Sequence, residues 1–514
     1  MAFNPLSANV LCEERTLPPA GIPGVRMSRR LISFSLAGLT TVSLLIACSS
    51  GSSSGGGGAT AAGVSSGSTA GTGSGSGSSP PAAPTSATPP GPPVGRWYKG
   101  DLHSHSAPYS QDADRQLGDD PGTCFFLAET AGLDFLALTD HRTFDQTRDP
   151  TYRANTLTIL NGCEWGGPVH IGMVGLTQDL PYYDVDTTNP ATVNAQVQAI
   201  YDEVHRQGGV VITNHPTDGD KAHVYLSHSF DAVEVWNIYW NFPTAWKDGQ
   251  EADVDQKLRD LGLSGIGEDA NPEIREAMRV QGGGQNHQAL KFYEANLMRG
   301  RKIAAVGGGD RHSLTFPGLP TTYVFAEDQS APKLLEGIKK ARTWVGAHEG
   351  PIVDFSADGD GDGVYEAFLG DSVPLQQAVT FRLRVQNAQH GKVEVIKDGA
   401  VLRTYDVLSP DDTYTFTDTA SARSWYRVDV WEKVDLNVPS SSGFQVLALF
   451  GSLAGQQGTH ALTTLAAPLG FQVSIGTTRV PQVRLPHAYD QILNFDRLRW
   501  GYSRGAITSP IWAE

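Results

Sequence analysis

Cysteine is scarce in this chain, and several common catalytic motifs are missing from it. Only four cysteines occur among 514 residues, and none stands in a CxxC pair or in the Cys/His spacing of a zinc or redox motif. Cys124 and Cys163 lie in the main body of the chain, where a disulfide and two buried thiols are both open readings. The absence of HExxH excludes a simple zinc protease, and the absence of a glycine-rich loop ending in Lys-Ser/Thr excludes a P-loop nucleotide site.

Basic residues are also few compared with acidic residues. The chain has 39 Lys and Arg against 55 Asp and Glu, a formal net charge of −16, and it contains no long basic run. This balance argues against a nucleic-acid polymer held through phosphate contacts. The hydrophobic fraction of 39% is ordinary for a soluble globular protein, and the length is sufficient for about two or three domains with real cores. An acidic balance is compatible with a metal site rich in carboxylates.

The first 48 residues have the pattern of an export signal. Arg29 and Arg30 precede an apolar stretch over residues 31–47, and small residues flank Cys48. The sequence LIAC resembles the lipobox of bacterial lipoproteins, so we expect cleavage before Cys48 and lipidation of its thiol. An uncleaved signal anchor is the alternative. Either way the body of the protein is expected to be exported, and the lipoprotein reading places it on a bacterial membrane, in the periplasm or at the cell surface.

Residues 49–95 are expected to be a disordered linker. They consist almost entirely of Ser, Gly, Ala, Thr and Pro, which cannot bury enough apolar surface to offset the entropy of ordering them. The Gly/Ser-rich part is flexible and spans roughly 40 Å on average, whereas the proline-rich end is stiffer. The linker would hold the folded body away from the membrane.

From residue 96 to about residue 349, strand-like and helix-like segments alternate. Residues 190–209 have apolar positions at helical spacing and end in Gly-Gly before the apolar run VVIT. A second helix is predicted over residues 285–301, just before the apolar run IAAV. This rhythm predicts right-handed crossovers and a parallel α/β sheet that could close into a barrel.

Beyond residue 350 the hydrophobic period changes to two. Residues 379–433 contain several alternating runs, and Lys397-Asp398-Gly399 is a hairpin turn signal, so residues 350–514 are predicted to form an antiparallel β-sandwich. Apolar residues 506–512 suggest a closing strand, and the role of residues 436–505 is left open.

The junction between these regions carries the acidic sequence DGDGDG. Asp358, Asp360 and Asp362 precede Gly363 as in the first half of a calcium loop. The twelfth position is Leu369 instead of the glutamate that such loops use. A calcium site and a polar turn are therefore both open.

Metal-ligand types of residue stand at the end of one apolar run after another. The strand-like runs end in HSH, TDH, CE, NHP and GGGDRH. Ligands in parallel α/β folds bind beyond the carboxyl ends of the strands, so we expect these side chains to converge. The residues are His103, His105, Asp140, His141, Glu164, His215, Asp310 and His312.

Imidazole and carboxylate ligands suit zinc, manganese and iron, and a carboxylate can bridge two cations. This many histidines together with Glu164 and Asp310 favours two or three divalent metals over one. A metal-ligating histidine commonly donates its other N–H to a carboxylate, and Asp140 is the predicted partner of His141, or a ligand beside it.

The ordered set of HxH, TDH, Glu, NHP and DRH resembles the PHP (polymerase and histidinol phosphatase) family of metal-dependent hydrolases over about 250 residues. The resemblance implies a distorted (β/α)7 barrel over residues 96–349, with a di- or trinuclear site. Many members are phosphoesterases. The DLHSHS sequence, the block from residue 290 to residue 313 and the TSPIW ending are most similar to an exported, carbaryl-hydrolase-like branch in which a β-sandwich follows the barrel.

The same resemblance assigns the ligands. Four residues would hold one metal: His103, His105, Glu164 and Asp310. Glu164 would bridge to a second metal held by His170 and His215.

His141 and His312 would hold a third metal. Family members complete that position with a histidine or acid after the HxH, and Asp112 is the nearest acid in this chain.

A bridging hydroxide is the attacking group that this site implies, with Glu164 shared between the two metals. Arg142 and Arg311 directly follow ligand residues and could contact a phosphoryl oxygen, while salt bridges at the barrel rim are the alternative. A small phosphoester is the favoured substrate, and a carboxylic ester or carbamate is the alternative on the same site. A non-catalytic surface-binding lipoprotein is the alternative from another class.

Overall fold

The computed structural model describes residues 94–113, 118–166, 170–180, 190–216, 229–237, 285–312, 317–433 and 502–514. The predicted signal peptide and all but the last two residues of the predicted linker lie outside these ranges, as does the stretch from residue 436 to residue 501. No helix within the described ranges is long and apolar enough to cross a membrane. Cys124 and Cys163 are buried and do not form a disulfide, in agreement with the reading as two thiols.

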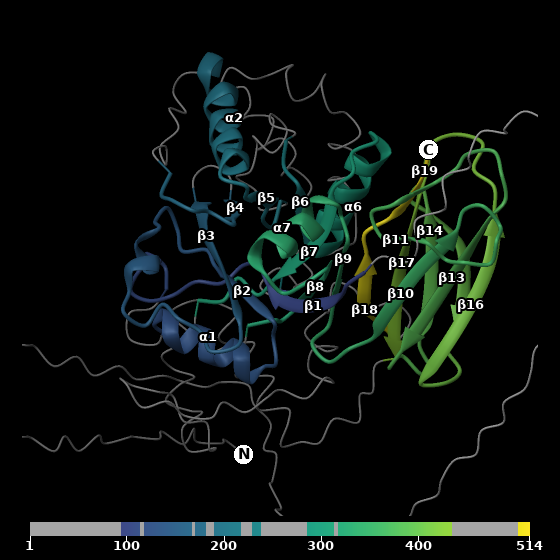
Figure 1. Cartoon of the computed structure of the whole chain (residues 1–514), viewed down its shortest axis with the longest axis horizontal. Helices are drawn as coiled ribbons and strands as arrows, with labels where there is room; N and C mark the ends of the chain where they lie inside the picture. Colours follow the sequence, from purple (N-terminus) through teal and green to yellow (C-terminus); the bar gives the residue numbers. More distant parts are fainter. Residues whose placement is uncertain are drawn as a thin grey trace, which may run out of the picture. The chain divides into compact units, whose positions relative to one another are not determined.

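The N-terminal region is built on one mixed sheet (Figure 1). Along the sheet the strands follow the order β9-β8-β1-β2-β3-β4-β5-β6-β7. Their bounds are β1 Arg96–Asp101, β2 Phe135–Leu138, β3 Thr158–Gly166, β4 His170–Val174, β5 Val210–Thr213, β6 Ala232–Asn237, β7 Ala304–Gly308, β8 Thr321–Ala326 and β9 Thr343–Gly346.

The expectation of an all-parallel sheet is wrong. β1, β2 and β3 are parallel to one another, and so are β5, β6 and β7, but β4 is antiparallel to both of its neighbours. The reason is the connection: β3 ends at Gly166 and β4 begins at His170, which is too short for a parallel crossover. β8 is antiparallel to both β1 and β9. A (β/α)7 barrel is not shown by the described residues and stays a prediction.

Helices α1 (Pro121–Thr130), α2 (Pro190–Arg206), α6 (Gln285–Met298) and α7 (Ala331–Lys339) belong to this region (Figure 1). The two helices predicted from the sequence are α2 and α6. The helix α1 begins where the side chain of Asp120 accepts a hydrogen bond from the backbone N–H of Thr123 at 2.8 Å. A short 3-10 helix, Asp145–Arg148, follows β2.

The outer edge of β7 is bonded to side chains rather than to another backbone. The Thr322 hydroxyl of β8 accepts from the Gly307 N–H at 2.8 Å and donates to the Gly307 carbonyl at 2.7 Å. The Ser509 hydroxyl accepts from the Ala305 N–H at 2.9 Å, and the Thr343 hydroxyl donates to the Ala305 carbonyl at 2.8 Å. These bonds satisfy backbone groups that a free edge would expose.

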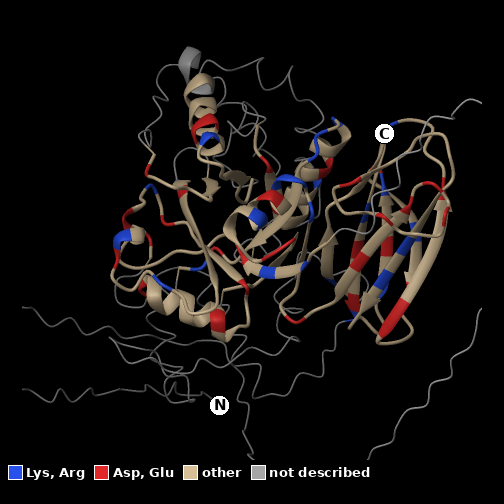
Figure 2. Cartoon of the chain, in the orientation of Figure 1, with Lys and Arg blue, Asp and Glu red and all other residues tan. Residues whose placement is uncertain are grey.

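The C-terminal region forms two facing sheets, as its alternating pattern predicts. One has the order β11-β10-β13-β16, and the other contains β15, β14, β17, β18, β19 and β12. Their apolar faces share one buried core that includes Phe355, Phe381, Val393 and Val428. Figure 2 shows acidic and basic residues interspersed along these strands. The bounds are β10 Ile352–Asp358, β11 Ala367–Phe368, β12 Ser372–Val373, β13 Val379–Gln386, β14 Lys392–Lys397, β15 Ala400–Asp406, β16 Asp411–Asp418, β17 Ser424–Lys433, β18 Tyr502–Thr508 and β19 Ile511–Ala513.

The two regions share hydrogen-bonded strands. β18 pairs with β17 of the sandwich on one side and with β9 of the N-terminal sheet on the other. The predicted closing strand at residues 506–512 therefore corresponds to β18 and β19. The predicted division at residues 349 and 350 stays a prediction, since the sheet runs past it. The predicted turn joins β14 to β15, with Asp398 and Gly399 at φ of 50° and 80°.

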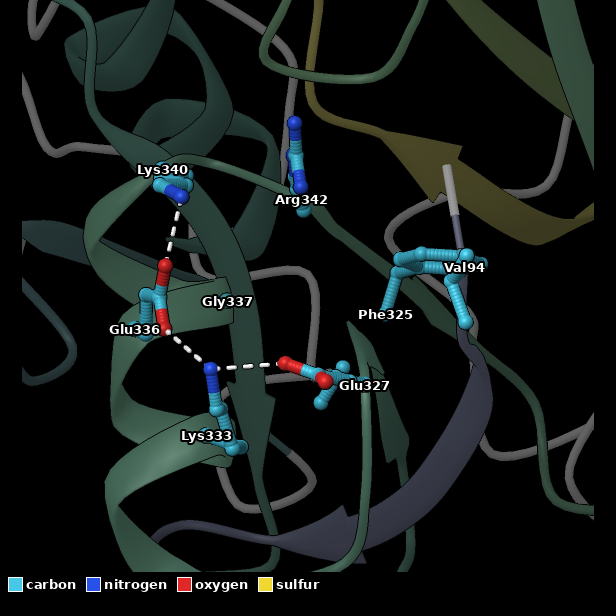
Figure 3. A pocket seen from close by; sticks show the side chains of 9 residues that line it. Val94, Phe325, Glu327, Lys333, Glu336, Gly337, Lys340 and Arg342 are labelled. Carbon is cyan, nitrogen blue, oxygen red and sulfur yellow. Dashed lines mark hydrogen bonds and ion pairs between the residues drawn. The ribbon is translucent and has the colours of Figure 1, made fainter. Parts of the chain in front are cut away.

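A cavity of about 270 Å³ lies where β1 begins, among β8, α7 and Val94 (Figure 3). Lys333 ion-pairs with Glu327 and Glu336 there, and Lys340 pairs with Glu336. The lysines and glutamates balance one another. The predicted ligands lie at the other end of β1, so this cavity is not part of their site.

Candidate metal centre

The predicted ligands converge at one edge of the N-terminal sheet. His103 and His105 follow the end of β1. His141 follows β2, and its backbone forms an isolated parallel β-bridge with that of Glu164 in β3. The edge is buried: His103, His105 and Glu164 are at most 1% exposed. The candidate ligands that the structure brings together there are His103, His105, Asp112, His141, Glu164, His170, His215, Asp310 and His312.

A first group comprises the four residues that the resemblance gives to one metal. Nε2 of His103 lies 3.1 Å from Oε2 of Glu164 and 3.2 Å from Oδ1 of Asp310. Nε2 of His105 lies 3.3 Å and 3.2 Å from the same two oxygens. Two imidazole nitrogens and two carboxylate oxygens thus face one point, and zinc, manganese and iron all accept such a donor set.

A second group gathers on the other oxygen of Glu164. Nδ1 of His170 lies 3.1 Å from Oε1 of Glu164, and Nε2 of His215 lies 3.6 Å from it. Because β4 runs antiparallel to β3, its first residue, His170, pairs with Gly166 at the end of β3. The start of β4 therefore reaches the same edge as the ends of its neighbours. Glu164 stands between the first and second groups, where a bridging carboxylate would stand.

A third group forms around Asp112. Its Oδ2 lies 2.8 Å from Nε2 of His141 and 3.0 Å from Nε2 of His312. Burial raises the pKa of Asp112, but the hydrogen bonds to these two histidines outweigh burial, and the pKa lies below its ordinary value. The acid that the sequence offered as an inexact match is thus the residue that joins the two histidines.

The donor set fits divalent cations by its charge as well as its chemistry. Oε2 of Glu164 has three imidazole nitrogens within 3.4 Å, yet it accepts no hydrogen bond from any described residue. Burial lowers the pKa of His105, but the adjacent carboxylates of Asp310 and Glu164 raise it to about 10. The adjacent carboxylates thus favour positive charge at this position. Buried carboxylates require paired charge or coordinated metal.

Two predicted partners have other contacts. Asp140 does not hold His141: its two oxygens accept from the N–H and the hydroxyl of Ser106, at 2.6 and 2.7 Å. Burial raises the pKa of Asp140 to about 6, despite these bonds and nearby histidines. Arg311 is fully buried, and its guanidinium pairs with Asp119, so the salt-bridge alternative describes it.

A backbone hydrogen bond to Glu164 holds Arg142 beside the site. Its N–H donates to the backbone carbonyl of Glu164 at 2.8 Å, and its φ is 53°. The side chain is partly exposed beside the site, so the contact with a phosphoryl oxygen stays a prediction.

The sequence analysis missed a set of polar residues behind the ligands. Asp101 accepts from the backbone N–H of His103 at 3.0 Å, and Asn214 donates to Oε1 of Glu164 at 3.0 Å. Glu234 and Asn237 lie on β6 and are at most 1% exposed. The signal was one acidic residue inside the otherwise apolar run AVEVW, which marks a buried charge that needs partners.

Two ligands have unusual backbone geometry. His215 has φ of 25° and Asp310 has φ of 46°, values that cost of order 1–3 kcal/mol at a residue other than glycine. A glycine is needed two residues before Asp310. A Cβ on Gly308 would lie 2.4 Å from Oε1 of Glu234 and 2.4 Å from Cβ of His103. The GGGD sequence thus brings β7 close to the ligands of β1.

The acidic turn at the start of the sandwich has a fourth carboxylate. Asp358, Asp360 and Asp362 lie together with Glu366, which the sequence reading did not include. Both oxygens of Asp358 accept from backbone N–H groups, those of Gly361 at 2.6 Å and Gly363 at 2.9 Å. These bonds are those of a polar turn, and calcium binding stays a prediction.

No protein-family model matches the chain, and no curated protein matches it. Among solved structures, a two-domain protein from Bacteroides vulgatus that contains a predicted PHP-like metal-dependent phosphoesterase is similar over 67% of this chain and 94% of its own, at 14% identity and a TM-score of 0.30. The CARDB domain of a Pyrococcus furiosus protein is similar over 18% of this chain and 82% of its own, at 19% identity and a TM-score of 0.13. TM-scores this low do not establish a shared fold.

Proposed function

We propose that this protein is a metal-dependent hydrolase that acts on a small phosphoester. The observation that carries the proposal is the position of Glu164: one oxygen faces His103 and His105, and the other faces His170 and His215. A fully buried carboxylate between two sets of imidazoles fits a ligand shared by two divalent cations. The sequence resemblance to PHP hydrolases favours phosphoesters, and the lipobox-like sequence that ends at Cys48 favours an exported, lipid-anchored protein.

Three groups of residues would hold zinc, manganese or iron: His103, His105, Glu164 and Asp310; Glu164, His170 and His215; and Asp112, His141 and His312. When bound, such cations lower the pKa of a coordinated water towards neutrality and polarise the bond to be cleaved.

The chain's own residues would set the geometry. Glu164 keeps both sets of imidazoles on one carboxylate, and Asn214 orients that carboxylate through its 3.0 Å hydrogen bond. Arg142 lies next to the site and could orient an anionic substrate, because a guanidinium matches the geometry of a phosphoryl group.

The test is a set of parallel assays on purified protein loaded with zinc or manganese. The substrates are nitrophenyl phosphate, bis-nitrophenyl phosphate and naphthyl acetate, and the variants are Glu164→Gln and, as a matched control, Asp411→Asn, an exposed carboxylate of the sandwich. We expect the rate of phosphoester hydrolysis to fall by more than about 100-fold in Glu164→Gln, which exceeds the 10–100-fold loss typical of mutating residues that only support metal ligands. The rate is expected to be unchanged in Asp411→Asn.

Other outcomes separate the alternatives. Activity on naphthyl acetate alone would favour the carboxylic ester or carbamate reading. Inactivity on all three substrates, with less than one equivalent of bound metal, would favour a non-catalytic surface-binding lipoprotein. Undiminished activity in Glu164→Gln would remove Glu164 from the mechanism.

A further inference from the structure

One carboxylate lies behind the ligands and contacts two of them. Glu234 is on β6, is 1% exposed and points towards the edge of the sheet where the ligands gather. Its Oε1 lies 2.9 Å from Nδ1 of His103. Its Oε2 accepts from the backbone N–H of His215 at 2.7 Å and from the side-chain amide of Asn237 at 3.1 Å. The predicted ligand set does not include this residue.

The contact between Glu234 and His103 determines which ring nitrogen of His103 has a lone pair available to bind a metal. A neutral imidazole carries one N–H, and a carboxylate at 2.9 Å from Nδ1 stabilises the form with the proton on Nδ1. Nε2 then has its lone pair free, and that atom faces Glu164 and Asp310. Glu234 therefore turns the metal-binding nitrogen of His103 towards the first group.

The second oxygen acts on a different group. His215 holds φ at 25°, which the backbone does not adopt without support. The hydrogen bond from its N–H to Glu234 supplies that support. Asn237 extends the connection, because its amide also donates to Oδ2 of Asp310 at 3.3 Å. One side chain thus connects a ligand of the first group, a ligand of the second group and, through Asn237, a third ligand.

The neighbouring histidine offers an internal comparison. Nδ1 of His105 faces the hydroxyl of Ser110 at 3.2 Å, and that hydroxyl donates to Asp112 at 2.6 Å. The hydroxyl of Ser110 also accepts from the backbone N–H of His141 at 3.4 Å. Ser110 is neutral, whereas Glu234 is a carboxylate and connects the first group to the second. Removing Ser110 should therefore disturb the site less than removing Glu234.

We propose that Glu234 is the positioning residue of this metal centre: it fixes the Nδ1-protonated form of His103 and the backbone of His215, so that the first and second groups bind their cations together. The inference rests on the metal site of the proposed function. Residues of this kind affect metal affinity by about 10–100-fold without touching the metal.

The experiment measures cobalt binding to the full chain, by competition with a chromophoric chelator and by the visible absorption spectrum of bound cobalt. Glu234→Ala is expected to weaken binding by about 10–100-fold and to change the spectrum. Glu234→Gln keeps an acceptor for His103 and is expected to fall between Glu234→Ala and wild type. Ser110→Ala is expected to have a smaller effect than Glu234→Ala.

The possible failures are distinct. Wild-type affinity and an unchanged spectrum in both Glu234 variants would overturn the role of Glu234 and leave the metal site intact. Absence of cobalt binding by wild type would overturn the proposed function itself. If Glu234→Ala does not fold, the isosteric Glu234→Gln decides, and a wild-type affinity and spectrum in that variant would count against the inference.

Discussion

Within the described ranges, two buried clusters of charge differ in the groups that face their carboxylates. The interface cluster joins α6 to the sandwich: the guanidinium of Arg427 on β17 pairs with Glu294 of α6 and with Asp429, and Arg504 lies 3.3 Å from Asp429. The metal-site cluster has buried carboxylates, among them Glu164, which faces imidazoles and accepts a hydrogen bond from the side-chain amide of Asn214.

The difference shows what the metal-site cluster requires. In the interface cluster, arginines pair with the buried carboxylates, although burying a guanidinium carries a desolvation penalty. At the metal site the adjacent arginine, Arg311, is buried and pairs with Asp119. The remaining carboxylates face histidines, which are neutral metal ligands in their ordinary state. Bound cations would supply there the charge that Arg427 supplies at the interface.

The largest effect on stability is expected at the interface cluster. Arg427→Met removes the guanidinium that Glu294 and Asp429 share and leaves them only their outer partners, Lys291 and Arg504. Breaking this buried pairing should lower the free energy of unfolding by about 3–5 kcal/mol. Urea unfolding of the metal-free protein measures it. Arg384→Met is the matched control, because Arg384 pairs with Asp411 on the exposed face of the sandwich and should contribute no more than about 1 kcal/mol. Equal losses in the two variants would contradict the comparison.

Metal binding at a single site is expected to have the next largest effect. Free metal at about 100 times its dissociation constant should stabilise the folded protein by about 2.7 kcal/mol per site, and a chelator should remove that gain. Thermal unfolding with and without metal tests this. Glu164→Gln should lose most of the gain, whereas Arg427→Met, although less stable, should keep it. A melting temperature that does not respond to metal in the wild type would count against the metal-site cluster.

The smallest effect is expected at a single partly buried pair. Nε2 of His205 lies 2.8 Å from Oδ2 of Asp231, and this hydrogen bond raises the pKa of His205 in the folded protein. The pair therefore stabilises the fold fully below pH of about 6.5, and the contribution is lost as pH rises through the raised pKa. The stability difference between wild type and His205→Gln should shrink from pH 5.5 to pH 8.5. A difference independent of pH would refute this.

Much of the fold follows from sequence pattern. The spacing in α2 and α6 and the alternation in the sandwich are local signals, and the structure has those elements. The direction of β4 could also have been inferred, since three residues between β3 and β4 allow only an antiparallel turn. The contact of β18 with β9 could not, because the partners are more than 150 residues apart and no local pattern specifies such a pairing.

The position of the site could be predicted from those ligands that lie at the carboxyl ends of strands. His103, Glu164 and Asp310 share an edge because the ends of parallel strands share one. The roles of residues such as Glu234 and Arg311 depend on what packs behind the ligands. A single acid in a buried strand and an arginine after a ligand do not reveal their partners, which come from other strands and loops.

The central claim is that the buried carboxylates and imidazoles at the edge of β1, β3 and β7 hold divalent cations. An anomalous diffraction map of crystals grown with zinc, collected at the zinc edge, tests it most directly. The account predicts a peak about 2.0–2.2 Å from Oε2 of Glu164 and from Nε2 of His103 and His105, with a second peak on the Oε1 side of Glu164. A map of the loaded protein without a peak beside Glu164 would contradict it.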